Sequence, residues 1–153
     1  MAKNIDPKLK KIGDYLTLEE FSIFSIPEYQ RAYSWEIKQC DKLWQDIENF
    51  KESEGTDPYF FGTIIINCQD DDTKLSLIDG QQRTTTFILL CKALLLRILK
   101  AIAGTDNDND SKNLNMALTL KRNRLIKMLY KVSDNDLYPL LEDLGNAKEN
   151  KIL

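Results

Sequence analysis

The chain of 153 residues contains no histidine. Catalytic serine–histidine–aspartate triads, cysteine–histidine pairs and histidine-ligated metal sites are therefore excluded. The sequence also lacks the pattern GxxxxGK followed by Ser or Thr, and it lacks GxGxxG. Both common glycine-rich nucleotide-binding loops are thus missing. Any chemistry must use carboxylates, arginine, lysine, threonine, tyrosine or backbone amides.

Cysteines are few, and the net charge is small. Three cysteines, never spaced as CxxC, predict buried, reduced thiols: Cys40, Cys68 and Cys91. The 21 basic and 24 acidic residues leave a net charge of −3, which disfavours a generally basic nucleic-acid-coating protein. Basic residues interrupt the most apolar stretch, 87–103, so we expect a core helix there and no membrane span. Since the polar start carries no secretory signal, we expect a cytoplasmic protein.

Local patterns predict a mixture of helices and strands. Thr17 and Glu20 match a capping box, which predicts a short helical turn. Apolar and β-branched runs predict a strand over 21–26 and a hairpin made by 59–67 and 74–78. Helical spacing predicts a helix over 35–52, capped by Ser34 and with apolar residues Cys40, Leu43, Trp44, Ile47 and Phe50.

A longer helix is expected to start at a cap formed by Thr84 or Thr85 and to run to about residue 103. Its predicted buried face is Phe87, Leu90, Cys91, Leu94, Leu95, Ile98 and Ile102. A polar loop over 104–113 follows, then helix over 114–120. The stretch 125–132 fits either more helix or a strand, and a further helix is predicted over 134–144.

The segment Asp79-Gly80-Gln81-Gln82-Arg83 is the strongest local signal. It places a turn between a buried strand and a helix N-terminus, where free backbone N–H groups and the helix dipole favour anions. Arg83 adds a bidentate donor for phosphate oxygens, and Thr84 to Thr86 add hydroxyls. Asp79 is a candidate Mg²⁺ ligand. The same residues also fit a purely structural turn with a salt bridge.

A second segment, 26–35, reads Ile-Pro-Glu-Tyr-Gln-Arg-Ala-Tyr-Ser-Trp. Arg31 could meet a second phosphate, and one of the aromatic residues could stack on a base. A folded loop pinned by its aromatic side chains is the structural alternative.

Together these segments, with Phe60-Phe61-Gly62-Thr63-Ile64 between them, resemble the N-terminal domain of GmrSD-type modification-dependent restriction enzymes. That family is related to the ParB/sulfiredoxin-like fold. The resemblance covers about residues 15–103 and, more weakly, 129–144; it favours a strand near 125–132. It implies an α+β domain with a small mixed sheet and packed helices, followed by the start of a helical region.

The resemblance also implies a domain that binds and hydrolyses nucleoside triphosphates with Mg²⁺ or another divalent cation. By this resemblance the catalytic residues are Asp79, Gln82 and Arg83, with Asp79 as metal ligand. The nucleotide and phosphate site comprises Gln30, Arg31, Gly80, Gln81, Arg83, Thr84 and Thr85. A non-catalytic module that senses DNA or a nucleotide is the alternative.

The family's usual His-Asn-His nuclease domain cannot lie in a chain without histidine. The expected partners are therefore modified DNA and a nuclease domain or separate nuclease subunit. We expect a flexible arm over 1–14, the GmrSD-type domain over 15–145 with its loop at 104–113, and a truncated or frayed end over 146–153.

Overall fold

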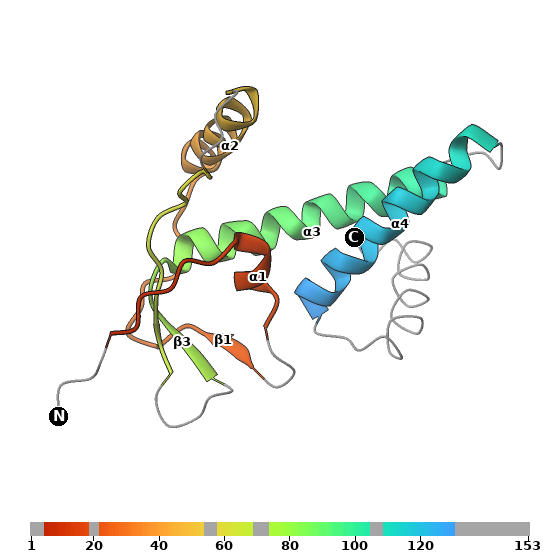
Figure 1. The fold of residues 1–153 in the computed structure, drawn as a ribbon. Helices are drawn as coiled ribbons and strands as arrows, with labels where there is room; N and C mark the ends of the chain where they lie inside the picture. Colours follow the sequence, from red (N-terminus) through yellow and green to blue (C-terminus); the bar gives the residue numbers. More distant parts are fainter. Residues whose placement is uncertain (1–4, 19–21, 54–57, 69–73, 105–108, 131–153) are drawn as a thin grey trace. The chain divides into compact units, whose positions relative to one another are not determined.

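A computed structural model describes residues 5–18, 22–53, 58–68, 74–104 and 109–130. The chain divides into two compact units, residues 21–90 and residues 1–20 together with 91–153. Helix α3 (Gln81–Ala103) is continuous and contributes residues to both units (Figure 1). Four helices accompany one small mixed sheet in the described parts, which confirms the expected α+β class.

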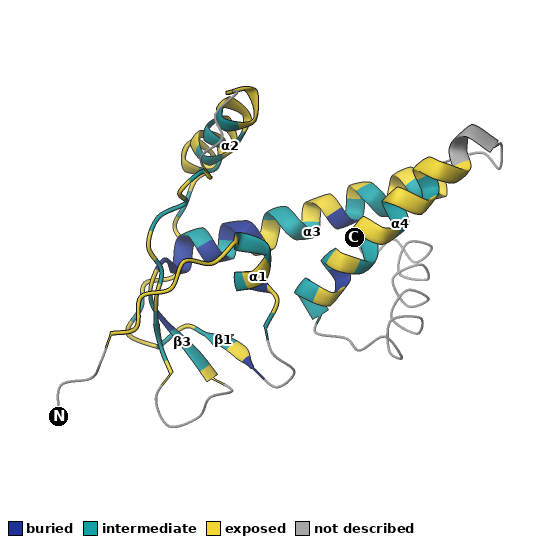
Figure 2. Ribbon diagram, viewed as in Figure 1, coloured by how far each residue is buried: buried dark blue, intermediate teal, exposed yellow. Residues whose placement is uncertain are grey.

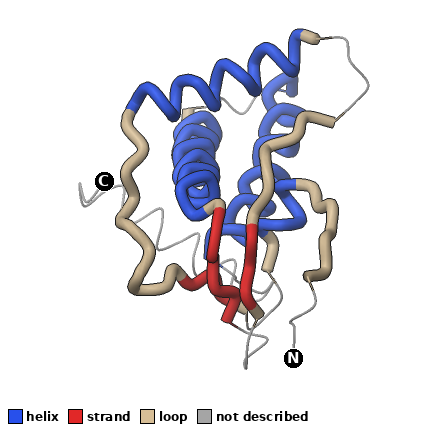
Figure 3. The backbone as a smooth tube through the Cα atoms, turned by 90° about the vertical axis from the view of Figure 1, so that its left-hand side faces the viewer, coloured by secondary structure: helices blue, strands red, loops and turns tan. Residues whose placement is uncertain are grey.

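The sheet belongs to the unit 21–90 and has three strands, β1 (Ile23–Ser25), β2 (Ile65–Asn67) and β3 (Lys74–Asp79). Its strand order is β1-β3-β2; β3 pairs parallel to β1 and antiparallel to β2. Figure 3 draws the strands in red among the helices. The predicted hairpin of the second and third strands is confirmed. Leu77 in the central strand is 1% exposed. The middle of this sheet is therefore its best-buried part, and β3 ends directly before α3.

The second strand is shorter than the predicted range 59–67. Its first half instead forms a chain of aromatic contacts: ring centroids lie 4.6 Å apart for Tyr59–Phe61 and 4.9 Å apart for Phe61–Phe87. Gly62 has a φ of +100°, which is incompatible with a regular strand. Side-chain packing and this glycine conformation thus replace the strand ladder before residue 65.

Helix α2 (Ile37–Glu52) begins two residues later than predicted, because Glu36 is its N-cap and not Ser34. The Gln39 side chain accepts a hydrogen bond of 3.1 Å from the Glu36 N–H, completing a capping box. Every residue of α2 is at least partly exposed (Figure 2). Trp44, which its spacing placed on the apolar stripe, is 45% exposed.

The other unit contains α1 (Ile12–Leu16), the C-terminal part of α3 and α4 (Asn109–Tyr130). Its core is the pair Leu95 and Ile126, each 0% exposed. Partly buried apolar residues pack around this pair: Leu99, Leu125, Leu129 and Tyr130. Leu94, predicted to be buried, is 42% exposed, because α3 buries only one stripe here.

Several predictions in this unit are wrong. Thr17 ends α1 instead of starting a helix, and its hydroxyl donates to the Gly13 carbonyl oxygen at 2.8 Å. The predicted loop over 104–113 overlaps α4, which starts at Asn109. The strand favoured near 125–132 is helical as far as Tyr130, since Ile126 packs on Leu95 as a helix residue. The helix predicted over 134–144 lies outside the described residues.

Among the described residues, no helix combines the length and the apolar character that crossing a membrane requires. The cysteines differ from the prediction of three buried thiols. Cys68 is exposed, whereas Cys40 and Cys91 are half-buried.

Candidate functional site

The turn between β3 and α3 is built on Gly80, whose φ is +86°. A Cβ atom at this position would lie 2.8 Å from Cγ1 of Ile64, so both conformation and space require glycine. Helix α3 therefore starts at Gln81, and neither Thr84 nor Thr85 is its N-cap. The Thr84 hydroxyl is buried and donates to the Gly80 carbonyl oxygen at 3.0 Å.

The start of α3 leaves backbone donors at this turn. Its first intrahelical hydrogen bond joins the Thr84 N–H to the Gly80 carbonyl oxygen at 2.9 Å. The N–H groups of residues 81–83 precede that bond, so the helix itself offers them no acceptor. The positive end of the helix dipole lies at the same place. Both features favour a negatively charged ligand.

A cavity of about 240 Å³ opens beside the turn. It brings together the two segments that the sequence analysis singled out, which are some 50 residues apart. Its lining consists of Gln30, Arg31, Trp35, Asp79, Gly80, Gln81, Gln82 and Arg83. Two arginines and one aspartate give this lining a formal charge of 2 − 1 = +1, although the whole chain carries −3.

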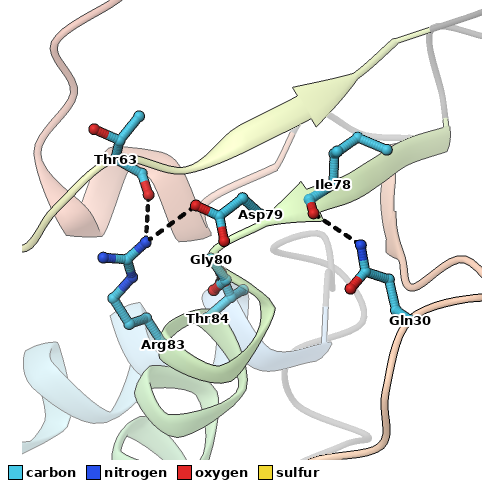
Figure 4. A network of polar contacts seen from close by, with 7 residues as sticks. All are labelled: Gln30, Thr63, Ile78, Asp79, Gly80, Arg83 and Thr84. Carbon is cyan, nitrogen blue, oxygen red and sulfur yellow. Dashed lines mark hydrogen bonds and ion pairs between the residues drawn. The ribbon is translucent and has the colours of Figure 1, made fainter.

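Arg83 is held by two groups at the mouth of the turn (Figure 4). Its Nη2 donates to the Thr63 carbonyl oxygen at 2.5 Å and lies 3.7 Å from Oδ2 of Asp79. The guanidinium also covers Gly62, where a Cβ atom would lie 2.2 Å from Nη1. The Asp79 side chain is 63% exposed and that of Arg83 is 29% exposed. The arginine is thus oriented by backbone contacts, while the carboxylate remains open to solvent.

Gln30 connects the first segment to the sheet. Its Nε2 donates to the Ile78 carbonyl oxygen at 2.8 Å (Figure 4). The preceding turn is closed by a hydrogen bond of 2.9 Å from the Gln30 N–H to the Pro27 carbonyl oxygen. Gln30 and the neighbouring Arg31 are therefore fixed beside the end of β3.

The two glutamines at the start of α3 bind the backbone of the first segment. Gln82 Oε1 accepts the Ser34 N–H at 2.8 Å, and its Nε2 donates to the Ala32 carbonyl oxygen at 3.2 Å. Nε2 of Gln81 donates to the Arg31 carbonyl oxygen. Oε1 of Gln81 is buried and has no hydrogen-bond partner among the described residues. This atom is an acceptor that still lacks a donor.

Tyr33 adds a further contact between the same two parts of the chain. Its hydroxyl lies 3.0 Å from Oγ1 of Thr86 and 3.6 Å from Sγ of Cys40. The Thr86 contact lowers the pKa of the Tyr33 hydroxyl, but partial desolvation and the Cys40 thiol outweigh it and raise that pKa above its ordinary value. Tyr33 is thus a neutral hydrogen-bonding group at neutral pH.

The comparison with family models decides the relationship. The model of the GmrSD restriction endonuclease N-terminal domain matches residues 12–152. The chain belongs to this family. It is thereby part of a restriction system. No curated protein matches the chain.

Within this GmrSD N-terminal domain, most predicted site residues lie together. Seven of them line the cavity: Gln30, Arg31, Asp79, Gly80, Gln81, Gln82 and Arg83. Thr84 and Thr85 are not in the lining, and the Thr84 hydroxyl is used inside the helix. The described residues include no cluster of three or more His, Cys, Asp or Glu side chains that could hold a metal.

Two residues were missing from the predicted site. Trp35 lines the cavity, and Gly62 lies under the Arg83 guanidinium. Trp35 belonged to the aromatic segment, in which one aromatic residue was expected to stack on a base, but it was not singled out from the others. Gly62 carried a usable signal, because glycine inside an otherwise β-branched stretch marks a bend or a close approach of another group.

Proposed function

We propose that this domain binds a nucleoside triphosphate at the turn between β3 and α3 and hydrolyses it with a divalent cation. The supporting observation is the cavity, which combines two arginines, an open carboxylate and a helix N-terminus. Those groups match the charge and hydrogen-bonding pattern of a metal-bound polyphosphate. In this proposal nucleotide turnover belongs to the work of the restriction system that contains the domain.

The size of the cavity favours the phosphates as its occupant in this proposal. Pockets that enclose a drug-sized ligand typically measure roughly 300–1,000 Å³. The present cavity of about 240 Å³ is smaller, so it suits the phosphate end of a nucleotide, with the base near its rim. Trp35 is the aromatic residue in the lining and offers a face for stacking.

A cation would be held by Asp79 and the phosphates of the ligand. Mg²⁺ is usually bound through one or two carboxylates plus substrate phosphates, so a single open carboxylate fits this mode. The cation would neutralise charge on the phosphates during transfer. Because Asp79 also pairs with Arg83 at 3.7 Å, ligand binding would exchange part of that ion pair for contacts to the phosphates and the cation.

The chain's own residues have separate roles in the proposal. Arg83 keeps donors beyond Nη2 for phosphate oxygens, since a guanidinium carries five N–H groups. Arg31 supplies a second positive charge in the lining of the cavity. The unpartnered Oε1 of Gln81 accepts hydrogen bonds only, so it suits a hydroxyl or a water molecule and not a phosphate oxygen.

Thermal unfolding with ATP, GTP, CTP and UTP, each with and without Mg²⁺, tests binding. A ligand at about 100 times its dissociation constant adds about 2.7 kcal/mol. For a chain of this size that raises the midpoint by roughly 5–10 °C. Phosphate release with and without a chelator then tests hydrolysis.

Matched arginine variants locate the site. Arg83→Ala is expected to abolish the nucleotide-dependent shift, whereas Arg97→Ala, an exposed arginine on the same helix, should leave it unchanged. If Arg83→Ala retains full nucleotide affinity, the proposed site is wrong. A salt-sensitive affinity for DNA without nucleotide turnover would favour the sensing module instead.

A further inference from the structure

We infer that Gln82 is a positioning residue, which fixes the backbone of residues 32–34 and thereby holds Arg31 and Trp35 at the cavity. A directly reacting role would need its amide to face the ligand. Both ends of that amide are instead occupied by backbone groups, the Ser34 N–H at 2.8 Å and the Ala32 carbonyl oxygen at 3.2 Å.

The bonding pattern is specific to an amide side chain. Gln82 offers one acceptor and one donor, and the segment 32–34 presents one donor and one acceptor two residues apart. Glutamate at position 82 would keep the acceptor and lose the donor. Methionine would keep the length of the side chain and lose both hydrogen bonds. The two substitutions therefore separate the two halves of the contact.

The segment held in this way carries cavity residues at both ends. Arg31 precedes the bonded backbone and Trp35 follows it, and both line the cavity. Gln81 supports the same segment through the Arg31 carbonyl oxygen, and Tyr33 does so through Thr86. Because Gln82 is 9% exposed, water cannot readily replace its two hydrogen bonds.

Amide hydrogen exchange at Ser34 measures the contact between Gln82 and residues 32–34 without any ligand. In Gln82→Met the Ser34 amide is expected to exchange roughly tenfold faster or more, since its acceptor is gone. In Gln82→Glu it should stay close to wild type, because the carboxylate still accepts the Ser34 N–H. The Gln30 amide, bonded to the Pro27 carbonyl oxygen, serves as the internal reference and should be unchanged in both variants.

Gln39→Met is the matched control variant. Gln39 also accepts a backbone N–H through its side chain, but it does so at the start of α2. It should leave Ser34 exchange at the wild-type rate. Equal Ser34 exchange in wild type and Gln82→Met overturns the inference. An equal acceleration of all amides in Gln82→Met also overturns it, because that result indicates general destabilisation.

The consequence for ligand binding rests on the proposed function and is measured separately. Gln82→Met and the double variant Arg31→Ala/Trp35→Ala should each weaken nucleotide binding, and adding Gln82→Met to that double variant should weaken it no further. Lost turnover in Gln82→Met with unchanged affinity and unchanged Ser34 exchange would instead assign Gln82 to the reacting groups and overturn the inference. If the wild-type protein binds no nucleotide, the proposed function fails. Ser34 exchange still tests whether Gln82 fixes the backbone of residues 32–34.

Discussion

Gly62→Ala tests how Arg83 is placed. The alanine Cβ would lie 2.2 Å from Nη1 of Arg83, so the guanidinium must move away from the Thr63 carbonyl oxygen. The residue would also have to keep a φ of +100°, which costs a non-glycine residue about 1–2 kcal/mol. The loss of a charge-assisted hydrogen bond adds about 1–2 kcal/mol after allowance for solvent at a side chain 29% exposed.

The expected destabilisation is therefore about 2–4 kcal/mol in equilibrium urea unfolding. In an Arg83→Ala background the clash is removed and only the backbone term should remain, so the penalty for Gly62→Ala should fall to about 1–2 kcal/mol. Nucleotide affinity, measured on the same proteins, should fall in Gly62→Ala because the displaced arginine no longer faces the cavity.

Two other glycines serve as controls. Gly80→Ala carries a similar backbone strain but meets Ile64 and not Arg83, so its penalty should be the same in both backgrounds. Gly104→Ala meets no atom closer than 3.6 Å and should be close to neutral. The reasoning is refuted if the Gly62→Ala penalty is equally large with and without Arg83.

Three further outcomes are expected. Leu95→Ala should lower the free energy of unfolding in urea by about 2–5 kcal/mol, because Leu95 is 0% exposed. The adjacent Leu94→Ala should lower it far less, because Leu94 is 42% exposed. Equal losses would contradict the assigned core. Gln39→Ala should cost about 0.5–1 kcal/mol by removing half of an exposed capping box, and a neutral result would show that the box contributes nothing. Burial raises the pKa of the Cys91 thiol, so the folded state retains this proton more strongly than the unfolded chain. The resulting stabilisation is complete below the unfolded thiol pKa of about 8.5 and is lost as pH rises through the higher folded value. Unfolding measured from pH 7 to 10 should therefore show a steeper loss of stability in wild type than in Cys91→Ala, and parallel profiles would contradict it.

Local patterns were sufficient for the elements that rest on short-range chemistry. The hairpin of β2 and β3 was predictable because two β-branched runs flank a polar turn, and α3 because its apolar residues repeat at helical spacing over many turns. The site residues were also recognisable as two motifs. Apart from the two threonines, the predicted site residues all line one cavity.

Helix ends were less predictable, because several residues can serve as a cap. Ser34 is a better intrinsic N-cap than Glu36, yet its N–H is bound by Gln82, a residue 48 positions away. Thr84 and Thr85 had the composition of a cap, but the conformation of Gly80 starts the helix before them. The first boundary was selected by a long-range contact and the second by the backbone conformation of a single glycine.

The sequence by itself thus provided the two motifs and a mixture of predicted helices and strands, and its family resemblance implied the α+β class. Only the tertiary structure separated the roles of the two glutamines, since their side chains are chemically identical. Gln82 meets a donor and an acceptor of a distant backbone segment, whereas Gln81 meets an acceptor alone and keeps an unpartnered oxygen. Hydrogen bonding is directional and short-ranged, so the role of each amide depends on which backbone groups the fold brings within about 3 Å of it.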